Sequence, residues 1–497
     1  MVKGSIYLTL SPCPAAREPD ADLALQVVGA DVFARHHRLR GHDVRLAAVS
    51  LEQGRDVERL ACERGGTPRA VADQWAERWD AALNALGVEL DDFVRTTDVR
   101  HQRVVKALFL KLFDKDHVRK GTRQGLFCPR CEEFAASDGA GGTCAACGQP
   151  LVERTEEAYF LRASRWRRAV LERLESHPEL IVPRERAEAL LEAAAESGIA
   201  DLCISRPRHE WSIPVPIDPD HSISVGFDAL VSYLTASGYL SEPQVFERYW
   251  PPDVQVVTQA GLADHALAWP AMLTALGLPL PERLVVRGRV TLEGVGKAPC
   301  DPAALATRFR TEGIRYALLR SAGYTEDARL SVADLVEAAN RDLADGLGRL
   351  VESTLSAIGE RRGGRVPRPG RLGAADEPLV SHAVALFAAT TQAIEGFDFR
   401  TALDRIWSVV AEAQARAERS READTPLYVQ AEVVRIVAHC LRPFLPGLAG
   451  RVLQSLGVDE ARRAPADLER WGVAQPQTCI QGEGPVFPPL AVPNGGR

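Results

Sequence analysis

Four cysteines in the first third of the chain are spaced for metal binding. They form two Cys-x-x-Cys pairs, Cys128 with Cys131 and Cys144 with Cys147, and twelve residues separate the pairs. Four thiolates in this arrangement can close a tetrahedron around Zn²⁺, which leaves no open position for a substrate. The alternative is two free or redox-active dithiols. We favour a structural Zn²⁺ that folds the Gly-rich segment around these cysteines.

Three charged residues are weak candidates for catalysis. Asp20 and Asp22 precede or begin a predicted helix, where two carboxylates can hold a metal or serve as acid and base. Acidic residues at that place also cap helices, and we favour the capping interpretation. Lys297 is the only lysine after residue 120 and lies in a Gly-rich segment. It could contact an anion, and the alternative is a solvated surface lysine.

Three aromatic side chains are candidates for a binding pocket. His265 and Trp269 are four residues apart, so on a helix they share one face. Tyr233 lies on the neighbouring element of the chain. The three residues either line a pocket or pack in the core, and the pattern alone leaves both interpretations open.

The elements that would position these residues form an α/β protein. Apolar runs at residues 6–10 and 44–49 flank a helical period at 22–38, which is typical of a βαβ unit. Further strand-like runs occur at 223–225, 254–257 and 284–290, and amphipathic helices follow from residue 303. We therefore predict a split Rossmann-type parallel sheet with a zinc-binding insertion, followed by an α-helical bundle.

Composition narrows the class of protein. The chain has 497 residues, of which 46% are hydrophobic, and a net charge of −7, so several domains and no general affinity for nucleic acid are expected. No apolar run is long enough to span a membrane, and residues 1–16 lack the pattern of a signal peptide. These features predict a cytoplasmic protein. The sequence does not predict the oligomeric state.

Several runs, in order along the chain, resemble class I methionyl-tRNA synthetase. The runs are Ala-Asp-Val-Phe-Ala-Arg-His-His-Arg-Leu-Arg-Gly-His-Asp-Val at residues 30–44, Asp-Phe-Val-Arg-Thr-Thr-Asp at 92–98, Ile-Ser-Arg at 204–206, Trp-Ser-Ile-Pro-Val-Pro at 211–216, Phe-Asp-Ala-Leu at 227–230 and Trp-Pro-Ala-Met-Leu at 269–273. The resemblance implies that the helical bundle is similar to an anticodon-binding domain, and that Tyr233, His265 and Trp269 bind the amino acid. The divisions that it implies are 1–115 and 201–302 for the halves of the Rossmann-type domain, 116–200 for the inserted domain with zinc knuckles at 121–150, 303–340 for a connecting stem, 341–480 for the helical domain and 481–497 for a tail.

The chain departs from that family at its two ATP-binding signatures. The His-Ile-Gly-His element aligns with residues 20–23, Asp-Ala-Asp-Leu, so carboxylates stand where the family places phosphates. The Lys-Met-Ser-Lys-Ser loop is shortened to residues 294–302 and keeps only Lys297. Leu51 stands at the position of the family's Asp that binds the amino group of the amino acid. Gly226 stands at the position of the aromatic residue that closes on methionine. We therefore expect neither ATP nor tRNA to be used as in the family.

These departures lead to three hypotheses about function. The first is a synthetase-like protein that binds or processes an amino acid or its derivative without tRNA in specialised metabolism, similar to synthetase-like proteins that work with a partner enzyme such as a cupin. If it is an enzyme, it is of the ligase or aminoacyl-transfer type. The second is a non-catalytic paralogue that binds a protein, RNA or small ligand. The third, ranked last, is an active methionine-tRNA ligase.

Overall fold

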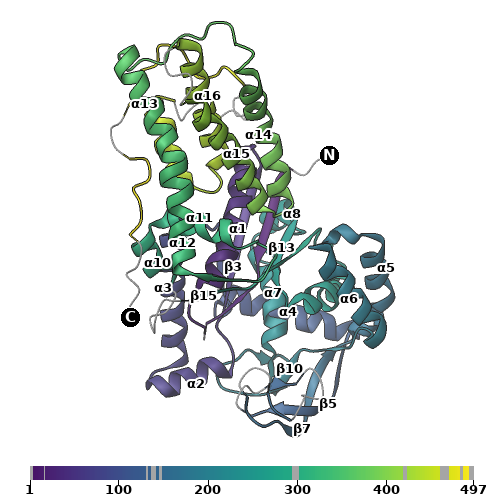
Figure 1. Ribbon diagram of the computed structural model, residues 1–497. Coiled ribbons are helices and arrows are strands. Elements are labelled where there is room, and N and C mark those ends of the chain that lie inside the picture. Colours follow the sequence, from purple (N-terminus) through teal and green to yellow (C-terminus); the bar gives the residue numbers. More distant parts are fainter. Residues whose placement is uncertain are drawn as a thin grey trace.

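A parallel sheet of seven strands forms the centre of the computed structural model, which describes residues 4–15, 17–129, 133–135, 142–144, 148–293, 301–417, 423–458, 470–481 and 485–491 (Figure 1). The strands are β1 (Ser5–Leu10), β2 (Cys13–Pro14), β3 (Asp43–Leu51), β4 (Asp92–Arg95), β8 (Ile181–Val182), β13 (Val254–Thr258) and β14 (Leu284–Arg287). Their order is β4-β3-β1-β13-β14-β8, with β2 beside the end of β3, and every pairing is parallel.

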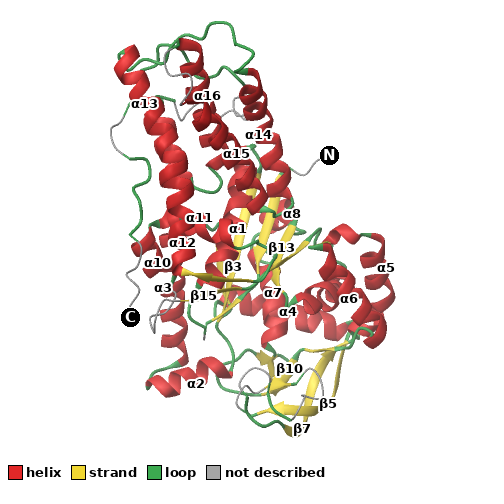
Figure 2. Ribbon diagram, viewed as in Figure 1, coloured by secondary structure: helices red, strands yellow, loops and turns green. Residues whose placement is uncertain are grey.

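Helices cover both faces of this sheet, because its strands carry apolar side chains on both sides (Figure 2). The helix α1 (Ala21–Leu39) packs on one face, where Leu8 and Leu46 point. The helices α4 (Val99–Asp114), α7 (Val225–Ala236) and α9 (Trp269–Leu276) lie on the other face, where Tyr7 and Val49 point. The predicted βαβ unit is confirmed, since β1, α1 and β3 cover the runs from which it was predicted.

Smaller elements surround the sheet. They are α2 (Arg55–Arg64), α3 (Pro68–Leu86), β5 (Val118–Cys128), β6 (Glu133–Phe134), β7 (Val152–Leu161), α5 (Arg167–Ser176), α6 (Arg184–Ser197), β9 (Leu202–Cys203), β10 (Ser205–Pro207), β11 (Pro214–Val215), β12 (Asp218–Ile223), α8 (Pro243–Tyr249), β15 (Val290–Glu293) and β16 (Ala328–Ser331). The strands β6-β5-β7-β9 form an antiparallel sheet, in which β5, β6 and β7 lie inside the predicted insertion and β9 lies just after it. The strand β8, also within the insertion, pairs with β14 of the main sheet. The insertion is therefore joined to the sheet that it interrupts.

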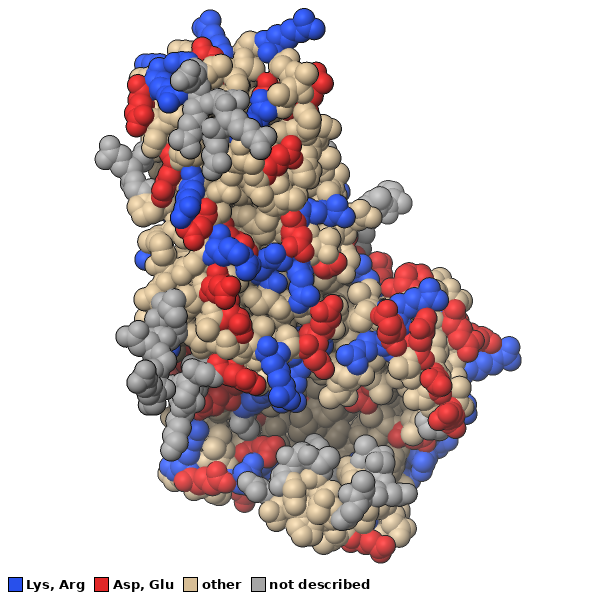
Figure 3. Space-filling model, in the orientation of Figure 1, with Lys and Arg blue, Asp and Glu red and all other residues tan. Residues whose placement is uncertain are grey.

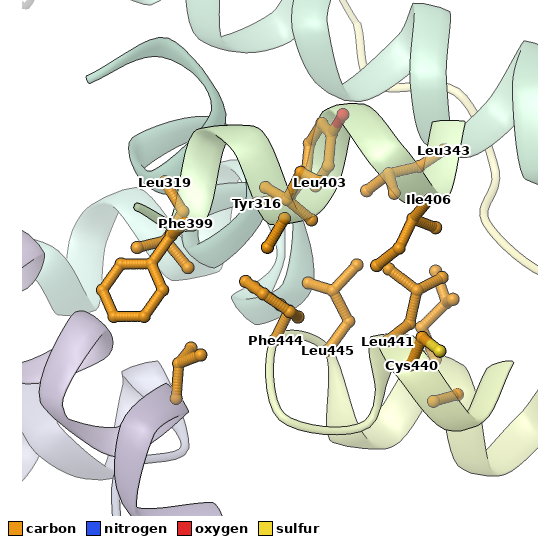
Figure 4. Packing of buried hydrophobic residues seen from close by; sticks show 14 of the residues in the cluster. Tyr316, Leu319, Leu343, Phe399, Leu403, Ile406, Cys440, Leu441, Phe444 and Leu445 are labelled. Carbon is orange, nitrogen blue, oxygen red and sulfur yellow. The ribbon is translucent and has the colours of Figure 1, made fainter. Parts of the chain in front are cut away.

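The C-terminal part is helical, as predicted. It contains α10 (Pro302–Phe309), α11 (Thr311–Ser321), α12 (Val332–Ala339), α13 (Arg349–Arg362), α14 (Glu377–Glu395), α15 (Phe399–Ala417), α16 (Asp424–Leu441) and α17 (Pro446–Ser455). Leu343, Leu403, Ile406, Leu441 and Leu445 fill its interior, each at most 1% exposed (Figure 4). Within the described residues, no helix is long and apolar enough to cross a membrane.

A buried ion pair joins this helical part to α1. Arg315 of α11 approaches Asp31 of α1 at 2.7 Å, and both side chains are at most 1% exposed. The same guanidinium donates to the carbonyl oxygens of Leu86, Pro443 and Phe444. Four segments that are far apart in sequence therefore meet at one arginine. In Figure 3 the visible face of the protein is hollowed below the helical part. Basic and acidic side chains are mixed over this face.

The buried histidine His36 predicts a loss of stability in acid. Burial is the main cause that lowers the pKa of His36 to about 3, His37 adds to the effect, and Glu395 opposes it. The unfolded chain takes up this proton near pH 6.5, so stability falls as the pH drops below about 6.5. From pH 7 to pH 5, the free energy of unfolding should fall by about 2 kcal/mol more in the wild type than in His36→Leu. Chemical denaturation at the two pH values measures this, with exposed His177→Gln as the control that should behave as the wild type.

Candidate functional site

A cleft opens where the strand order of the sheet reverses. The strand β1 lies between β3, which follows it closely in the chain, and β13, which comes about half a chain later. At the carboxyl ends of β1 and β13, the Thr258 backbone N–H donates to Ser11 Oγ at 3.1 Å. Open α/β sheets bind ligands outside the carboxyl ends of their strands at such a reversal. A cavity of about 220 Å³ lies there, lined by Ser11, Pro12, Cys13, Pro14, Arg17, Glu18, Asp20, Asp22, Leu23, Gln26, Trp79, Thr258 and Arg287.

The carboxylate Asp20 caps the helix that faces this cleft. Its Oδ1 accepts from the backbone N–H of Leu23 at 3.0 Å, and its Oδ2 accepts from Arg17 at 2.7 Å. The partial positive charge of the α1 N-terminus is thus offset by a side chain of the same helix. The structure agrees with the capping interpretation for Asp20.

The second carboxylate, Asp22, forms a buried ion pair with Arg287 at the end of β14. Arg287 Nη1 and Nη2 donate to Asp22 Oδ1 and Oδ2 at 2.7 and 2.8 Å, and both side chains are 6% exposed. The Val290 backbone N–H also donates to Asp22 at 2.9 Å, and Arg287 Nε donates to Gln26 at 2.8 Å. Burial by itself would raise the pKa of Asp22, but Arg287, Val290 and Arg17 outweigh it and hold this pKa below its usual value.

Sequence reasoning missed Arg287. The only signal was an arginine at the end of the otherwise apolar run 284–286, and its partner lies 265 positions earlier in the chain. The cleft also contains Cys13, where burial raises the pKa of the thiol to about 12. The thiol is therefore protonated at neutral pH, which agrees with a packing role and not with a nucleophile.

The structure brings Tyr233, His265 and Trp269 together. Their ring centroids are 5.5 Å apart for Tyr233 and His265, and 6.0 Å apart for Tyr233 and Trp269. His265 lies in a π-helical turn, Asp264–Ala268, that continues into α9. The exposed fractions of the three residues are 0%, 7% and 0%, so the group lies beneath the surface.

Hydrogen bonds determine which nitrogen of His265 carries the proton. Nδ1 lies 2.7 Å from the Gly261 carbonyl oxygen, which can only accept, so Nδ1 is the protonated nitrogen. Nε2 then accepts from the Tyr233 hydroxyl at 2.7 Å. Burial lowers the pKa of His265, which keeps the ring neutral. Among the described residues, the buried Trp269 Nε1 has no hydrogen-bond partner, so this N–H is left to donate to a ligand or a water.

Another buried carboxylate near the carboxyl end of β3 is engaged by its own neighbours. Glu52 accepts from Arg95 Nε at 2.7 Å and from the Thr97 hydroxyl, and it is 0% exposed. It stands next to Leu51, the residue at the amino-group position of the resemblance. Glu52 therefore has a structural role at the edge of the sheet.

The predicted zinc ligands are partly described. Cys128 ends β5 and is buried, and Cys144 is half-buried. The Gly148 backbone N–H donates to the Cys144 carbonyl at 2.7 Å, and Gly148 has a φ of 70°, so the chain turns tightly after the second pair. Cys131 and Cys147 lie outside the described residues, as does Lys297. The hydrogen bond from Gly148 to Cys144 is compatible with a zinc knuckle at the second pair, and the zinc site stays a prediction.

Comparisons with known proteins give a consistent family. The family model described as tRNA synthetases class I (M) matches residues 22–151 and 142–355. The methionine–tRNA ligase of Caldanaerobacter subterraneus subsp. tengcongensis is 35% identical over 464 residues, which cover 89% of this chain and 72% of that protein. The enzyme of the same name from Rhizobium meliloti is 31% identical over 509 residues, with 98% of each chain covered.

Solved structures give the same family. The Mycobacterium tuberculosis methionyl-tRNA synthetase in complex with methionyl-adenylate superposes with a TM-score of 0.91 at 30% identity, covering 97% of this chain and 99% of that chain. The apo form of the same synthetase gives a TM-score of 0.86 at 29% identity, covering 98% and 99%. The predicted α/β fold with a parallel sheet and a helical C-terminal part is confirmed over nearly the whole chain, while zinc binding by the insertion stays a prediction.

These findings correct two predictions. The prediction of a tRNA-independent function in specialised metabolism is wrong, and so is the prediction that tRNA is not used as in the family. Both rested on a few replaced signature residues, whereas the relatives match over most of the chain and are methionine–tRNA ligases. The likeness extends over the helical part as well as the sheet. The chain belongs to the methionyl-tRNA synthetase family of class I aminoacyl-tRNA synthetases.

Proposed function

We propose that this chain is a methionine–tRNA ligase, which joins methionine to tRNA at the expense of ATP. The observation that carries the proposal is the likeness, along 97% of the chain, to a methionyl-tRNA synthetase that holds methionyl-adenylate. Such an adenylate contains both the amino acid and the nucleotide. A cleft for it has to accept an apolar side chain at one end and phosphate and ribose at the other.

Two neighbouring regions supply these ends in our proposal. The amino acid binds beside Tyr233, His265 and Trp269, where the unpartnered indole N–H of Trp269 supplies a donor. The nucleotide end occupies the cavity between β1, α1 and β14. The Tyr233–His265 hydrogen bond fixes the orientation of both rings, so that they present one preformed surface to the substrate.

The charged candidates receive different roles. We assign Asp20 to capping α1 and Asp22 to the ion pair with Arg287, not to the chemical step. Lys297 is the candidate for stabilising the charge that develops on pyrophosphate, since an ammonium near a departing phosphate lowers the barrier. We also keep the domain divisions given by the resemblance as part of this proposal.

We further propose that Cys128, Cys131, Cys144 and Cys147 hold one structural Zn²⁺. The tight turn from Cys144 to Gly148 and the end of β5 at Cys128 support it. The metal would hold the two knuckles of the inserted sheet together and would take no part in the reaction.

The proposed activity predicts methionine-dependent exchange of labelled pyrophosphate into ATP, and charging of methionine tRNA. Both reactions should depend on methionine, ATP and Mg²⁺, and other amino acids should support neither. Well-folded protein that supports neither reaction would contradict the proposal.

The pocket assignment predicts that Tyr233→Phe lowers kcat/KM for methionine by roughly fivefold, since it removes the donor to His265, a loss of about 1 kcal/mol. The matched control is Tyr428→Phe in α16, whose buried hydroxyl donates to the Ala474 carbonyl. The control should lose a similar amount of stability and keep its activity. Equal kinetics in the two variants would show that Tyr233 only packs in the core.

The zinc proposal predicts one Zn²⁺ per chain by elemental analysis of freshly purified protein. Cys128→Ser should lower the zinc content and expose β5–β7 to proteolysis, while the helicity of the C-terminal part stays unchanged. The exposed Cys62→Ser is the control, and its zinc content should stay at one. Freshly purified wild-type protein that contains no zinc by elemental analysis would disprove the site.

A further inference from the structure

The Asp22–Arg287 ion pair lies in the wall of the cavity that the proposed function gives to the nucleotide. Both residues line this cavity, and both are nearly inaccessible to solvent. The Arg287 guanidinium donates to Asp22 twice, to Gln26 and to the Gly288 carbonyl. The guanidinium that could bind phosphate in this wall is therefore already bound to a carboxylate.

We infer that Asp22 competes with phosphate for Arg287, so that the ion pair acts as a latch which an anionic ligand must open. The inference rests on the proposed function in taking ATP as the physiological ligand of the cleft. It assigns the regulation of that cleft to one carboxylate on α1. The chemical class of ligand that the latch controls is a polyphosphate anion.

The geometry makes this competition direct. A guanidinium binds carboxylate and phosphate through the same paired N–H groups, so one anion excludes the other. Asp22 holds its place through four donors, because Val290 N–H and Arg17 also contact it. A polyphosphate has to replace all of these contacts or leave Arg287 unused.

The other charges around the cleft act in the same direction. Asp20 already occupies the N-terminus of α1, and Glu18 lies at the rim, where it pairs with Arg78. Arg17 is shared between Asp20 and Asp22. An incoming anion thus meets carboxylates beside each cation, which lowers its affinity until Asp22 moves away.

A purely structural role is the competing explanation. A buried ion pair between α1 and β14 can also hold the helix on the sheet, and removing one partner then costs stability. The two roles differ in what happens to anions. If the ion pair is only structural, weakening it leaves the affinity for anions unchanged. If Asp22 competes with anions for Arg287, weakening the ion pair increases that affinity.

The experiment compares the wild type with Asp22→Asn, which keeps the shape of the side chain and removes its charge. Calorimetry measures the dissociation constants for inorganic pyrophosphate and for ATP with Mg²⁺. We expect Asp22→Asn to bind both at least tenfold more tightly. The double variant Asp22→Asn with Arg287→Gln should lose this gain, since the guanidinium that binds the anion is absent.

The matched control is Asp31→Asn on the same helix. Asp31 also forms a buried ion pair with an arginine, Arg315, and the substitution removes the same charge outside the cleft. This control should be destabilised and should bind anions as the wild type does. If Asp22→Asn fails to fold, Asp22→Ser replaces it with the same expectation.

The outcomes separate the latch from the proposed function. Unchanged or weaker anion binding in the folded Asp22 variant overturns the latch, as does an equal gain in Asp31→Asn. If Asp22→Asn binds the anions more tightly but none of the proteins catalyses methionine-dependent exchange of pyrophosphate into ATP, the latch stands and the ligase proposal fails. If the wild type exchanges pyrophosphate and Asp22→Asn shows an unchanged KM for ATP, the ligase proposal stands and the latch fails.

Discussion

The pairing of β1 with β13 is the constraint on which the rest of the structure depends. Leu8 lies opposite Val254, and the Tyr7 and Asp253 residues exchange two hydrogen bonds, from Tyr7 N–H to the Asp253 carboxylate at 2.7 Å and from Asp253 N–H to the Tyr7 carbonyl at 2.9 Å. About 240 residues separate these two strands in the chain, so their pairing is a long-range contact. This pairing creates the reversal of strand order, and both the cleft and the neighbouring aromatic group lie on elements that it brings together.

The helical part depends on a second long-range contact. Arg315 is fully buried, pairs with Asp31 and donates to three backbone carbonyls from two other segments. Burial lowers the pKa of this guanidinium while Asp31 opposes that effect. A buried arginine is stable only when its donors are all engaged, so the position of the helices against α1 is well specified.

Local patterns predicted much of the fold and little of the site. The period of residues 22–38 and the apolar runs on either side were enough for the βαβ unit, and Asp20 was recognisable as a cap, because these signals lie within a few residues of each other. Arg287 was not recognisable, because its role depends on a partner that only the folded sheet brings near. The function was predicted wrongly for a related reason. The replaced signature residues together point away from the ligase activity, whereas the similarity over nearly the whole chain points towards it.

Asp22 and Arg287 are better understood as one unit than singly. Without Arg287, the buried Asp22 would keep only the 3.5 Å contact with Arg17 as its ion pair. Without Asp22, the buried Arg287 would lose its counter-ion, and unpaired buried charges are strongly destabilising. Together they form a neutral pair with short hydrogen bonds and a place in a closed network. The segment that the resemblance aligns with the His-Ile-Gly-His element therefore contributes to a buried ion pair. If Asp22 competes with anions as inferred, the affinity of the cleft for anions depends on the free energy needed to separate Asp22 from Arg287. Neither residue alone determines that free energy.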